Sequence, residues 1–356
     1  MSADNRYRAL PVELESAPAV AGLLQSLGLG TLDDAGVVSH IGRNDNWAGT
    51  TTSGAPVFIK RLGGERKDVR RRFAAIRAFE ELRAAAPGTA PSSPRCLGWS
   101  EEDAVVVFEL LADSRSGAEL ADDDAFDDKH AYRVGEMLGG LHSLDASAGV
   151  DLEDAAPPLP PLPYFDALPL ERYRAASFAE LELWRLLQQD EELAEAVRRL
   201  RADESRAPVC PIHGDFRLDQ VVLAHGTLHL LDWEEMRSGD PARDIGAYTG
   251  EWLHRAIRKL PGADDNDVVA RGVRELTRLR PMVEHFREGY QAVGRRLGRD
   301  LVLRSVGFAG WHVIDRVMAV AAQRPSLSPV ERAALGIART VLITPAAVTA
   351  LLGLED

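Results

Sequence analysis

The feature that most constrains this 356-residue chain is the tripeptide His213-Gly214-Asp215, followed at fixed distances by Gln220 and Asp232. Taken alone, His-Gly-Asp is usually a turn, because Gly and Asp both favour turns. Two short apolar runs separate Gln220 from Asp232, and they predict a β-hairpin. Its antiparallel strands would carry Gln220 and Asp232 to the same end. The spacing therefore predicts a loop and a hairpin that together gather polar side chains.

The hairpin itself is expected to have a four-residue loop. Its two strands and the loop are predicted at residues 221–223, 228–231 and 224–227. Antiparallel pairing of these strands sets Leu223 opposite Leu228.

These side chains and spacings suit phosphoryl transfer from ATP. That reaction requires the protein to bind triphosphate charge, to hold Mg²⁺ through oxygen ligands and to orient one acceptor hydroxyl. In the protein-kinase template, an Asp that receives the hydroxyl proton is followed five positions later by a metal-binding Asn, and a second metal-binding Asp lies beyond it. Asp215, Gln220 and Asp232 occupy these positions. We therefore expect ATP and Mg²⁺ as cofactors.

Three blocks of sequence resemble the aminoglycoside phosphotransferase and choline kinase superfamily. They read HGDFRLDQ, LDWE and GDPARD, at residues 213–220, 231–234 and 239–244. The resemblance extends less closely to three further places, which are Lys60 and residues 137–142 and 285–290. It implies a protein-kinase-like fold and an ATP-dependent kinase that phosphorylates an alcohol group.

The resemblance also implies roles for individual residues. Asp215 would orient or deprotonate the acceptor, Asp232 would bridge metal and phosphate, and Lys60 would bind the α- and β-phosphates. Asp244 would brace the loop from the following helix. A lysine at the end of an apolar strand is otherwise a solvated terminus. Its expected ion-pair partner is Glu80 on the next helix, although a plain surface salt bridge fits the pattern equally well.

Main-chain groups near the N-terminus are expected to cover the nucleotide. Residues 37–60 predict two strands around a turn-rich centre at residues 42–50. The glycines there do not form G-x-G-x-x-G, so phosphate contact would rely on the N–H groups and hydroxyls around Gly49, Thr50 and Thr51. An ordinary flexible hairpin would have the same sequence pattern.

The fold class predicted from these patterns is α+β, with a bilobal protein-kinase-like architecture. An amphipathic helix over residues 67–83 and a buried strand over 104–111 indicate a small antiparallel-sheet lobe with one long helix. Helical periodicity over residues 131–144 and 178–200 indicates a larger helical lobe.

A hinge is expected between the lobes, where the main chain of Glu109 and Leu111 would bind the adenine edge. The expected domains are a nucleotide-binding lobe, the hinge, and a catalytic and acceptor-binding lobe, at residues 1–108, 109–112 and 113–356.

Two positions depart from the family pattern. Gln220 replaces the usual Asn and keeps an amide oxygen for Mg²⁺, but its extra methylene makes Asp219 a competing ligand. Arg217 lies two residues past Asp215, where its guanidinium would stabilise charge on the transferred phosphoryl group. Alternatively, Arg217 pairs with Asp219 or Asp240, and the sequence leaves both interpretations open.

The block around Asp215, together with residues 310–316, is similar to kinase-like proteins of lanthipeptide and thioamitide biosynthesis. This resemblance implies a Ser or Thr hydroxyl of a ribosomal precursor peptide as acceptor and a separate lyase as a possible partner. A small-molecule hydroxyl is the alternative. On a helix, His312, Asp315 and Arg316 would share a face and could line an acceptor cleft. Alternatively, His312 would simply be a satisfied core residue beside Trp311.

Charge and composition narrow the partners. The formal net charge of −13 and the pI near 5.3 argue against a nucleic-acid partner and suit a cationic acceptor, although acidic surfaces also simply aid solubility. The first twenty residues show no signal-peptide pattern, and no later run is apolar enough to span a bilayer. Cys96 and Cys210 suit a reducing compartment. We expect a cytoplasmic protein without a membrane partner.

Two other classes compete with an active kinase. A catalytically silent kinase-fold protein that docks a peptide is suggested by Gln220 and the irregular glycine turn, but the presence of Lys60, Asp215 and Asp232 favours catalysis. A metal-dependent phosphoester hydrolase would need the histidine and aspartate clusters of a two-metal site, which the sequence lacks.

Overall fold

The computed structural model describes residues 14–32, 37–40, 43–145, 150–155, 157–260 and 268–355. The chain divides into two compact units. Unit 1 comprises residues 1–119, 148–153 and 219–236, and unit 2 comprises residues 120–147, 154–218 and 237–356. The units are therefore not contiguous parts of the sequence, because the segment that contains the predicted hairpin belongs with the N-terminal residues.

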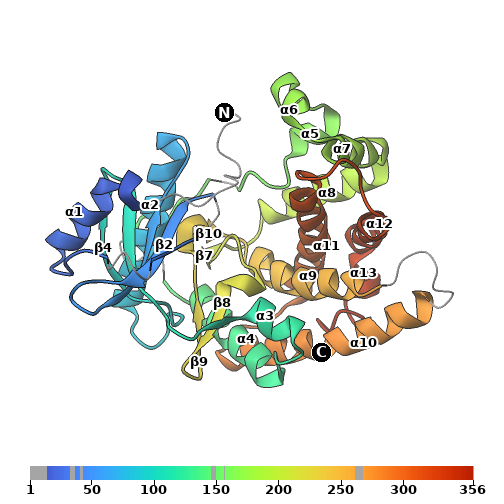
Figure 1. Cartoon of the computed structure of the whole chain (residues 1–356). Coiled ribbons are helices and arrows are strands. Elements are labelled where there is room, and N and C mark those ends of the chain that lie inside the picture. Colours follow the sequence, from blue (N-terminus) through green and yellow to red (C-terminus); the bar gives the residue numbers. More distant parts are fainter. Residues whose placement is uncertain are drawn as a thin grey trace. The chain divides into compact units, whose positions relative to one another are not determined.

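Unit 1 is built on a five-stranded antiparallel sheet in the order β1-β2-β3-β5-β4 (Figure 1). Its strands are β1 (Val38–His40), β2 (Asp45–Thr50), β3 (Pro56–Arg61), β4 (Cys96–Ser100) and β5 (Val105–Glu109). The accompanying helical elements are η2 (Leu14–Ser16), α1 (Pro18–Ser26) and the long helix α2 (Arg66–Ala85).

Side chains on β3 alternate between the two faces of this sheet. Ile59 joins the apolar cluster that includes Val20 of α1. The next residue, Lys60, pairs in register with Val106, and Val106 packs against Phe73 of α2. The strand period therefore directs Lys60 to the α2 face of the sheet.

A second, three-stranded sheet in unit 1 contains the predicted hairpin. Its strands, in the order β6-β8-β9, are β6 (Arg115–Ser116), β8 (Val221–Ala224) and β9 (Thr227–Leu230). The pairing of Leu223 with Leu228 is confirmed. The loop is shorter than predicted, because each strand extends one residue further and leaves only His225 and Gly226, with φ of 48° and 78°. Positive φ at both positions is typical of the tightest hairpin turns.

The turn-rich interpretation of residues 45–50 is wrong, since they form β2. Trp47 is fully buried and pairs with Ser39 on one side and Ile59 on the other. Burial and pairing on both sides outweigh the local turn preference of Asp45 and its neighbours. Gly42 lies outside the described residues.

Unit 2 is mainly helical (Figure 1). Its helices are α4 (Asp128–His142), α5 (Leu162–Asp166), α6 (Leu170–Ala175), α7 (Phe178–Gln189), α8 (Glu191–Glu204), α9 (Ala242–Arg258), α10 (Val268–Ala292), α11 (Arg299–Ala321), α12 (Pro329–Ile343) and α13 (Pro345–Val348). The short elements are the paired strands β7 (Cys210–Ile212) and β10 (Arg237–Gly239). Three elements begin or end near the boundary between the units: α3 (Gly117–Asp122), η4 (Leu218–Gln220) and η5 (Trp233–Glu235).

Close helix pairs form much of the core of unit 2, with α4 against α10 and α9 against α11. Glycine permits the first approach: a Cβ at Gly135 of α4 would collide with the carbonyl of Phe286, and one at Gly289 of α10 would collide with the carbonyl of Tyr132. Any larger side chain at either position would force these two helices apart.

The helical periodicity predicted over residues 178–200 belongs to two helices, α7 followed by α8. The break falls at Asp190, whose side chain accepts a hydrogen bond from the N–H of Leu193 at 3.1 Å and so caps α8. The predicted fold class is confirmed: a small antiparallel sheet with one long helix accompanies a larger helical part.

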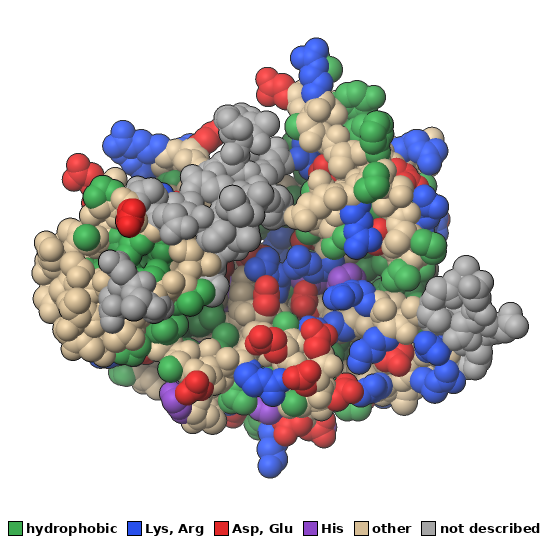
Figure 2. Space-filling view, in the orientation of Figure 1, with side chains coloured by type: hydrophobic (Ala, Val, Ile, Leu, Met, Phe, Trp, Pro, Cys, Tyr) green, Lys and Arg blue, Asp and Glu red, His purple; other side chains and the backbone are tan. Residues whose placement is uncertain are grey.

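The surface of unit 2 mixes both signs of charge. Figure 2 shows acidic and basic side chains interspersed over α3, α9 and α10, in keeping with the ion pairs Arg255–Asp122, Arg278–Asp124 and Arg280–Glu284. None of the described helices is long and apolar enough to cross a membrane.

Candidate active site

The His-Gly-Asp loop of unit 2 is held through its main chain. It follows β7, and Gly214 adopts φ of 82°, a conformation that favours glycine. The carboxylate of Asp244, near the start of α9, accepts hydrogen bonds from the N–H groups of His213 at 2.7 Å and Gly214 at 3.0 Å. The brace of the loop by Asp244 is therefore present as predicted.

Asp244 is buried within a chain of hydrogen bonds. Its Oδ2 lies 3.0 Å from Nε2 of His142, whose Nδ1 lies 2.9 Å from the hydroxyl of Tyr290. Burial alone would raise the pKa of Asp244, but the hydrogen bond and charge of His142 and the contacts with His213 lower it below its ordinary value. Asp244 therefore stays ionised and fixes the loop.

Asp215 presents its side chain to solvent. Its side chain is 46% exposed, whereas the neighbouring Phe216 is 1% exposed and anchors the loop in the core. Nη1 of Arg217 lies 3.7 Å from Oδ2 of Asp215, which is an ion-pair contact too long for a hydrogen bond. Asp240, which the sequence offered as an alternative partner for Arg217, instead accepts a hydrogen bond from Nε of Arg304 at 2.6 Å. The loop thus places a carboxylate and a guanidinium next to each other.

Unit 1 gathers Gln220 and Asp232 at the same end of the β8–β9 hairpin, as predicted. The N–H of Leu231 donates to the carbonyl of Gln220 at 2.9 Å and closes the ladder just before Asp232. Gln220 is 4% exposed, and the side chain of Asp232 is 31% exposed. Asp232 has φ of 66°, a left-handed conformation that Asp tolerates better than most residues, and it turns the chain from β9 into η5.

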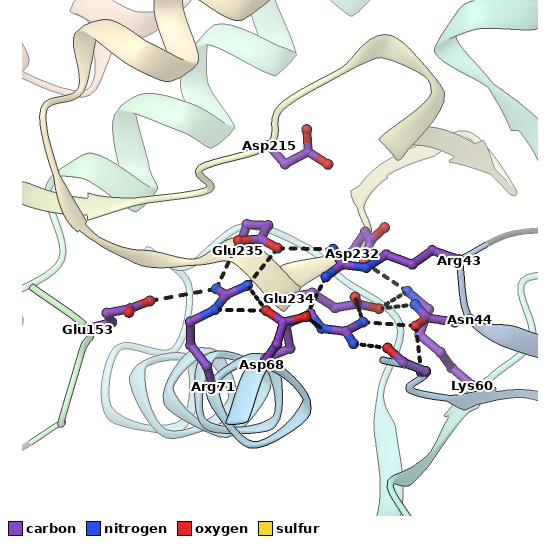
Figure 3. Close-up of polar contacts among 12 residues, drawn as sticks. Arg43, Asn44, Lys60, Asp68, Arg71, Glu153, Asp215, Asp232, Glu234 and Glu235 are labelled. Carbon is purple, nitrogen blue, oxygen red and sulfur yellow. Dashed lines mark hydrogen bonds and ion pairs between the residues drawn. The ribbon is translucent and has the colours of Figure 1, made fainter. Parts of the chain in front are cut away.

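Lys60 links the five-stranded sheet to that end of the hairpin (Figure 3). Its Nζ donates to Oδ1 of Asp232 at 2.8 Å and to Oε1 of Glu234 at 2.6 Å. Burial alone would lower the pKa of Lys60, but the two carboxylates outweigh this effect and raise it above its ordinary value. The ammonium group is therefore charged at physiological pH.

Residues 41–282 match the phosphotransferase enzyme family, which is more than half of the chain. The chain belongs to this family. A search of curated proteins finds no match. Membership identifies the chain as a phosphotransferase.

Solved kinase structures share the fold of this phosphotransferase at low sequence identity. Macrolide 2′-phosphotransferase MphH from Brachybacterium faecium is 19% identical with a TM-score of 0.52, over 92% of this chain and 98% of that one. Choline kinase LicA from Streptococcus pneumoniae is 14% identical with a TM-score of 0.54, over 93% and 99%. Amicoumacin kinase hAmiN, solved in complex with AMP-PNP, Ca²⁺ and Ami, is 14% identical with a TM-score of 0.54, over 91% of this chain and 92% of that one.

The phosphotransferase does not pair Lys60 with Glu80, which corrects the prediction made from the pattern of α2. The carboxylate of Glu80 instead binds Arg83, three residues further along the helix. The buried carboxylate that Lys60 binds comes from Glu234. This side chain is 174 positions away from Lys60 in the sequence, so no local pattern points to it.

The geometry of α2 explains the correction. Arg72 and Phe79 are seven residues apart, so they lie on one stripe of the helix, and this stripe faces η5. Phe79 stacks on Trp233 with ring centroids 3.6 Å apart, and Arg72 binds Glu234. Glu80 is one residue past the stripe and therefore about 100° around the helix from it.

The sequence did not predict Glu234, a buried carboxylate of this phosphotransferase's unit 1 that accepts three side-chain hydrogen bonds. Its Oε1 accepts from Lys60 and, at 2.7 Å, from Nδ2 of Asn44, while its Oε2 accepts from Nη1 of Arg72 at 3.0 Å. The available signal was its place two residues after Asp232 in the block LDWE.

The three residues expected to cover the phosphates of the nucleotide have different surroundings. A Cβ at Gly49 would lie 3.2 Å from Leu32, so packing accounts for this glycine. The hydroxyl of Thr51 is buried and accepts a hydrogen bond from the N–H of Ala55 at 3.1 Å, which serves the turn itself. Thr50 is exposed at the end of β2.

The predicted hinge follows β5. The N–H of Glu109 donates to the carbonyl of Arg95 at 2.9 Å, and the N–H of Leu110 donates to that of Pro56 at 3.1 Å. The side chain of Glu109 also binds Arg95. The sheet thus uses two consecutive main-chain donors just before Leu111.

The residues at the end of the hairpin fit a magnesium ion. Gln220 offers an amide oxygen and Asp232 offers a carboxylate, and hard cations prefer such oxygen ligands. Within the described residues, no group of three or more His, Cys, Asp or Glu side chains could hold a metal by itself. Mg²⁺ is usually held by one or two carboxylates with water and substrate phosphates, so this sparse donor set suits it.

Proposed function

We propose that this phosphotransferase transfers the γ-phosphoryl group of Mg-ATP to an acceptor hydroxyl, using the two groups of residues described above. The observation that carries the proposal is the ammonium of Lys60, held by Asp232 and Glu234 where an apolar strand meets the hairpin. A buried cation beside a half-exposed carboxylate suits a polyanion that arrives with a metal, since phosphate oxygens bind the cation and the metal binds the carboxylate.

In this proposal unit 1 binds the nucleotide. Lys60 contacts the α- and β-phosphates, and Gln220 and Asp232 hold Mg²⁺, which neutralises charge on the phosphates when bound. Leu111 is the hinge residue whose N–H group would donate to adenine, because the sheet already uses the N–H groups of Glu109 and Leu110. Of the three residues expected over the phosphates, Thr50 keeps the most accessible side chain.

Unit 2 activates the acceptor. The exposed carboxylate of Asp215 accepts a hydrogen bond from the acceptor hydroxyl and takes its proton as the hydroxyl oxygen bonds to phosphorus and the bond to ADP breaks. Arg217 stabilises negative charge on the transferred group. Asp244 shapes the loop through the main chain and does not touch the reactants.

Replacing Asp215 tests this assignment. In Asp215→Ala we expect kcat for ADP release to fall by about 10²- to 10⁴-fold, the usual contribution of a general base, while affinity for Mg-AMP-PNP stays within about twofold. Asp203→Ala, which removes an exposed carboxylate paired with Arg206, is the matched control and should turn over normally. Unchanged turnover in Asp215→Ala would remove Asp215 from the mechanism.

A small-molecule hydroxyl is the acceptor class that the solved relatives support. By their names, they act on a macrolide, on choline and on amicoumacin. The formal net charge of −13 suits a cationic small molecule.

A Ser or Thr hydroxyl of a ribosomal precursor peptide, followed by a separate lyase, is the second candidate. The observation that favours it is Arg217 beside Asp215, a cation placed where a Ser/Thr kinase has its phosphate-binding lysine. The two acceptor classes are separated by incubating the protein with Mg-ATP and either a panel of aminoglycosides, macrolides and choline or the Ser/Thr-rich peptides encoded beside its gene. Mass spectrometry then shows which class gains phosphate.

A further inference from the structure

The long helix of unit 1 contributes a cation to the lysine site. In the protein-kinase template, a glutamate on this helix pairs with the phosphate-binding lysine. Here the residue of α2 that reaches this site is Arg72. The carboxylate that binds the lysine comes from Glu234 (Figure 3). The helix therefore supplies a cation to this site, whereas the helix of the template supplies an anion.

We propose that Arg72 is a positioning residue for Lys60 and that it acts through Glu234. The proposal rests on the function proposed above, in which Lys60 binds phosphate. Arg72 fixes one oxygen of the Glu234 carboxylate so that the other oxygen holds the ammonium group in place.

The hydrogen bonds of Glu234 show how the two cations are connected. Oε2 accepts from Nη1 of Arg72 at 3.0 Å, and Oε1 accepts from Nζ of Lys60 at 2.6 Å and from Nδ2 of Asn44 at 2.7 Å. The side chain of Glu234 is 8% exposed. With both oxygens bonded, the carboxylate cannot turn without losing a charged partner.

Arg72 cannot itself reach a ligand. Its side chain is fully buried, with Nη1 also donating to Oδ1 of Asn44 at 2.9 Å and Nη2 donating to the carbonyl of Gly63. Nε lies 3.2 Å from Oδ2 of Asp68. Its influence on a nucleotide must therefore pass through the groups that it holds.

Arg71 provides a matched control. It is the neighbouring residue on α2 and also forms ion pairs, but with Glu235 at 2.9 Å, Asp68 at 2.9 Å and Glu153 at 3.6 Å rather than with Glu234. The side chain of Arg71 is 24% exposed. Replacing Arg71 removes a similar charge from the same helix turn without touching the carboxylate that holds Lys60.

The experiment compares Arg72→Met, Arg72→Lys and Arg71→Met. For Arg72→Met we expect the Kd for Mg-AMP-PNP and the KM for Mg-ATP to rise about tenfold, with Arg72→Lys intermediate and Arg71→Met within about twofold of the wild type. Without nucleotide, acetylation of Lys60 followed by mass spectrometry should be several-fold faster in Arg72→Met, because the released lysine becomes more accessible. Equal affinity and equal acetylation in Arg72→Met and wild type would overturn the proposal.

A double-mutant cycle separates positioning from a purely structural role. In a Glu234→Gln background, Arg72→Met should change the Kd for Mg-AMP-PNP by no more than about twofold, since its route to Lys60 is already broken. This double variant also removes both buried charges together, so it should fold even if Arg72→Met alone does not. A full tenfold effect in that background would overturn the proposal.

Failure of the proposed function gives a different result. A wild-type protein that does not bind Mg-AMP-PNP at all would contradict the assigned nucleotide site, whereas Lys60 acetylation in the absence of nucleotide would still decide whether Arg72 positions the lysine.

Discussion

The two units hold their central carboxylates in different ways. In unit 1, Glu234 is bonded by the side chains of Lys60, Arg72 and Asn44. In unit 2, Asp244 is bonded by two main-chain N–H groups and by His142. Both carboxylates are buried and each has three donors, so the number of hydrogen bonds does not distinguish them.

What differs is whether the donors can exchange partners. An ammonium group on a flexible stem can move from a carboxylate to a phosphate without disturbing the fold, whereas a main-chain N–H group cannot leave without remodelling its loop. Under the function proposed above, the charges of unit 1 serve ligand binding, whereas the carboxylate of unit 2 determines the shape of its loop. Substitutions should therefore affect binding in unit 1 and stability in unit 2.

The largest effect expected from this comparison is on stability. Asp244→Ala leaves buried donors on His142 and the loop without an acceptor and should lower the free energy of unfolding by about 3–5 kcal/mol. Asp232→Ala removes one of the two counter-ions of Lys60 and places Ala at a left-handed φ, so it should cost less, about 1–2 kcal/mol, while weakening Mg-AMP-PNP binding. Urea denaturation measures both. Equal destabilisation by the two variants would break the comparison.

A second effect depends on pH and arises from another carboxylate of unit 2. Oε1 of Glu251 on α9 lies 2.7 Å from Nε2 of His312 on α11. Burial raises the pKa of Glu251, but the hydrogen bond and charge of His312, with further cations nearby, lower it overall to about 2. Since the folded-state pKa is depressed, the stabilisation is complete above the unfolded value near 4.5 and is lost as pH falls toward 2.

The depressed pKa of Glu251 corresponds to roughly 3 kcal/mol in the free energy of unfolding, and this contribution is lost between about pH 5 and pH 2. Glu251→Gln should remove most of that dependence, so the unfolding free energies of variant and wild type should converge as the pH falls. Denaturant titrations at several pH values provide the measurement. A variant that keeps the full acid sensitivity of the wild type would show that Glu251 is not its source.

The smallest effect on stability is expected for Arg43, an exposed cation of unit 1. Arg43 is 52% exposed and pairs with Asp68 and Glu235. Exposed pairs contribute little, so Arg43→Ala should cost less than about 1 kcal/mol, and less still at high salt. Thermal denaturation at low and high salt tests this. A loss comparable to that of Asp244→Ala would mean that the outer ion pairs are as important to the fold as the main-chain contacts.

The sequence was most informative where the pattern is local. The register of Leu223 with Leu228 follows from strand alternation, and the α2 face of Lys60 follows from the same period of two. The brace at Asp244 came from a resemblance carried by contiguous blocks of sequence, and its contacts are present.

The sequence was least informative where distant segments meet. Glu80 was the natural partner for Lys60 among nearby acidic residues, but the choice between it and Glu234 depends on which stripe of α2 faces η5. The strand at residues 45–50 was also missed, because its turn-forming residues are outweighed by pairing on both sides with strands that the local window does not contain.

The discontinuous make-up of unit 1 has an evolutionary consequence. Residues 1–119 contain Lys60 and Arg72, but their shared counter-ion Glu234 comes from the later segment 219–236. A gene fragment that ended after residue 119 would encode two buried cations without that carboxylate. A single crossover at that point would separate the two cations from their shared counter-ion, so recombination cannot transfer unit 1 as one contiguous piece of the gene.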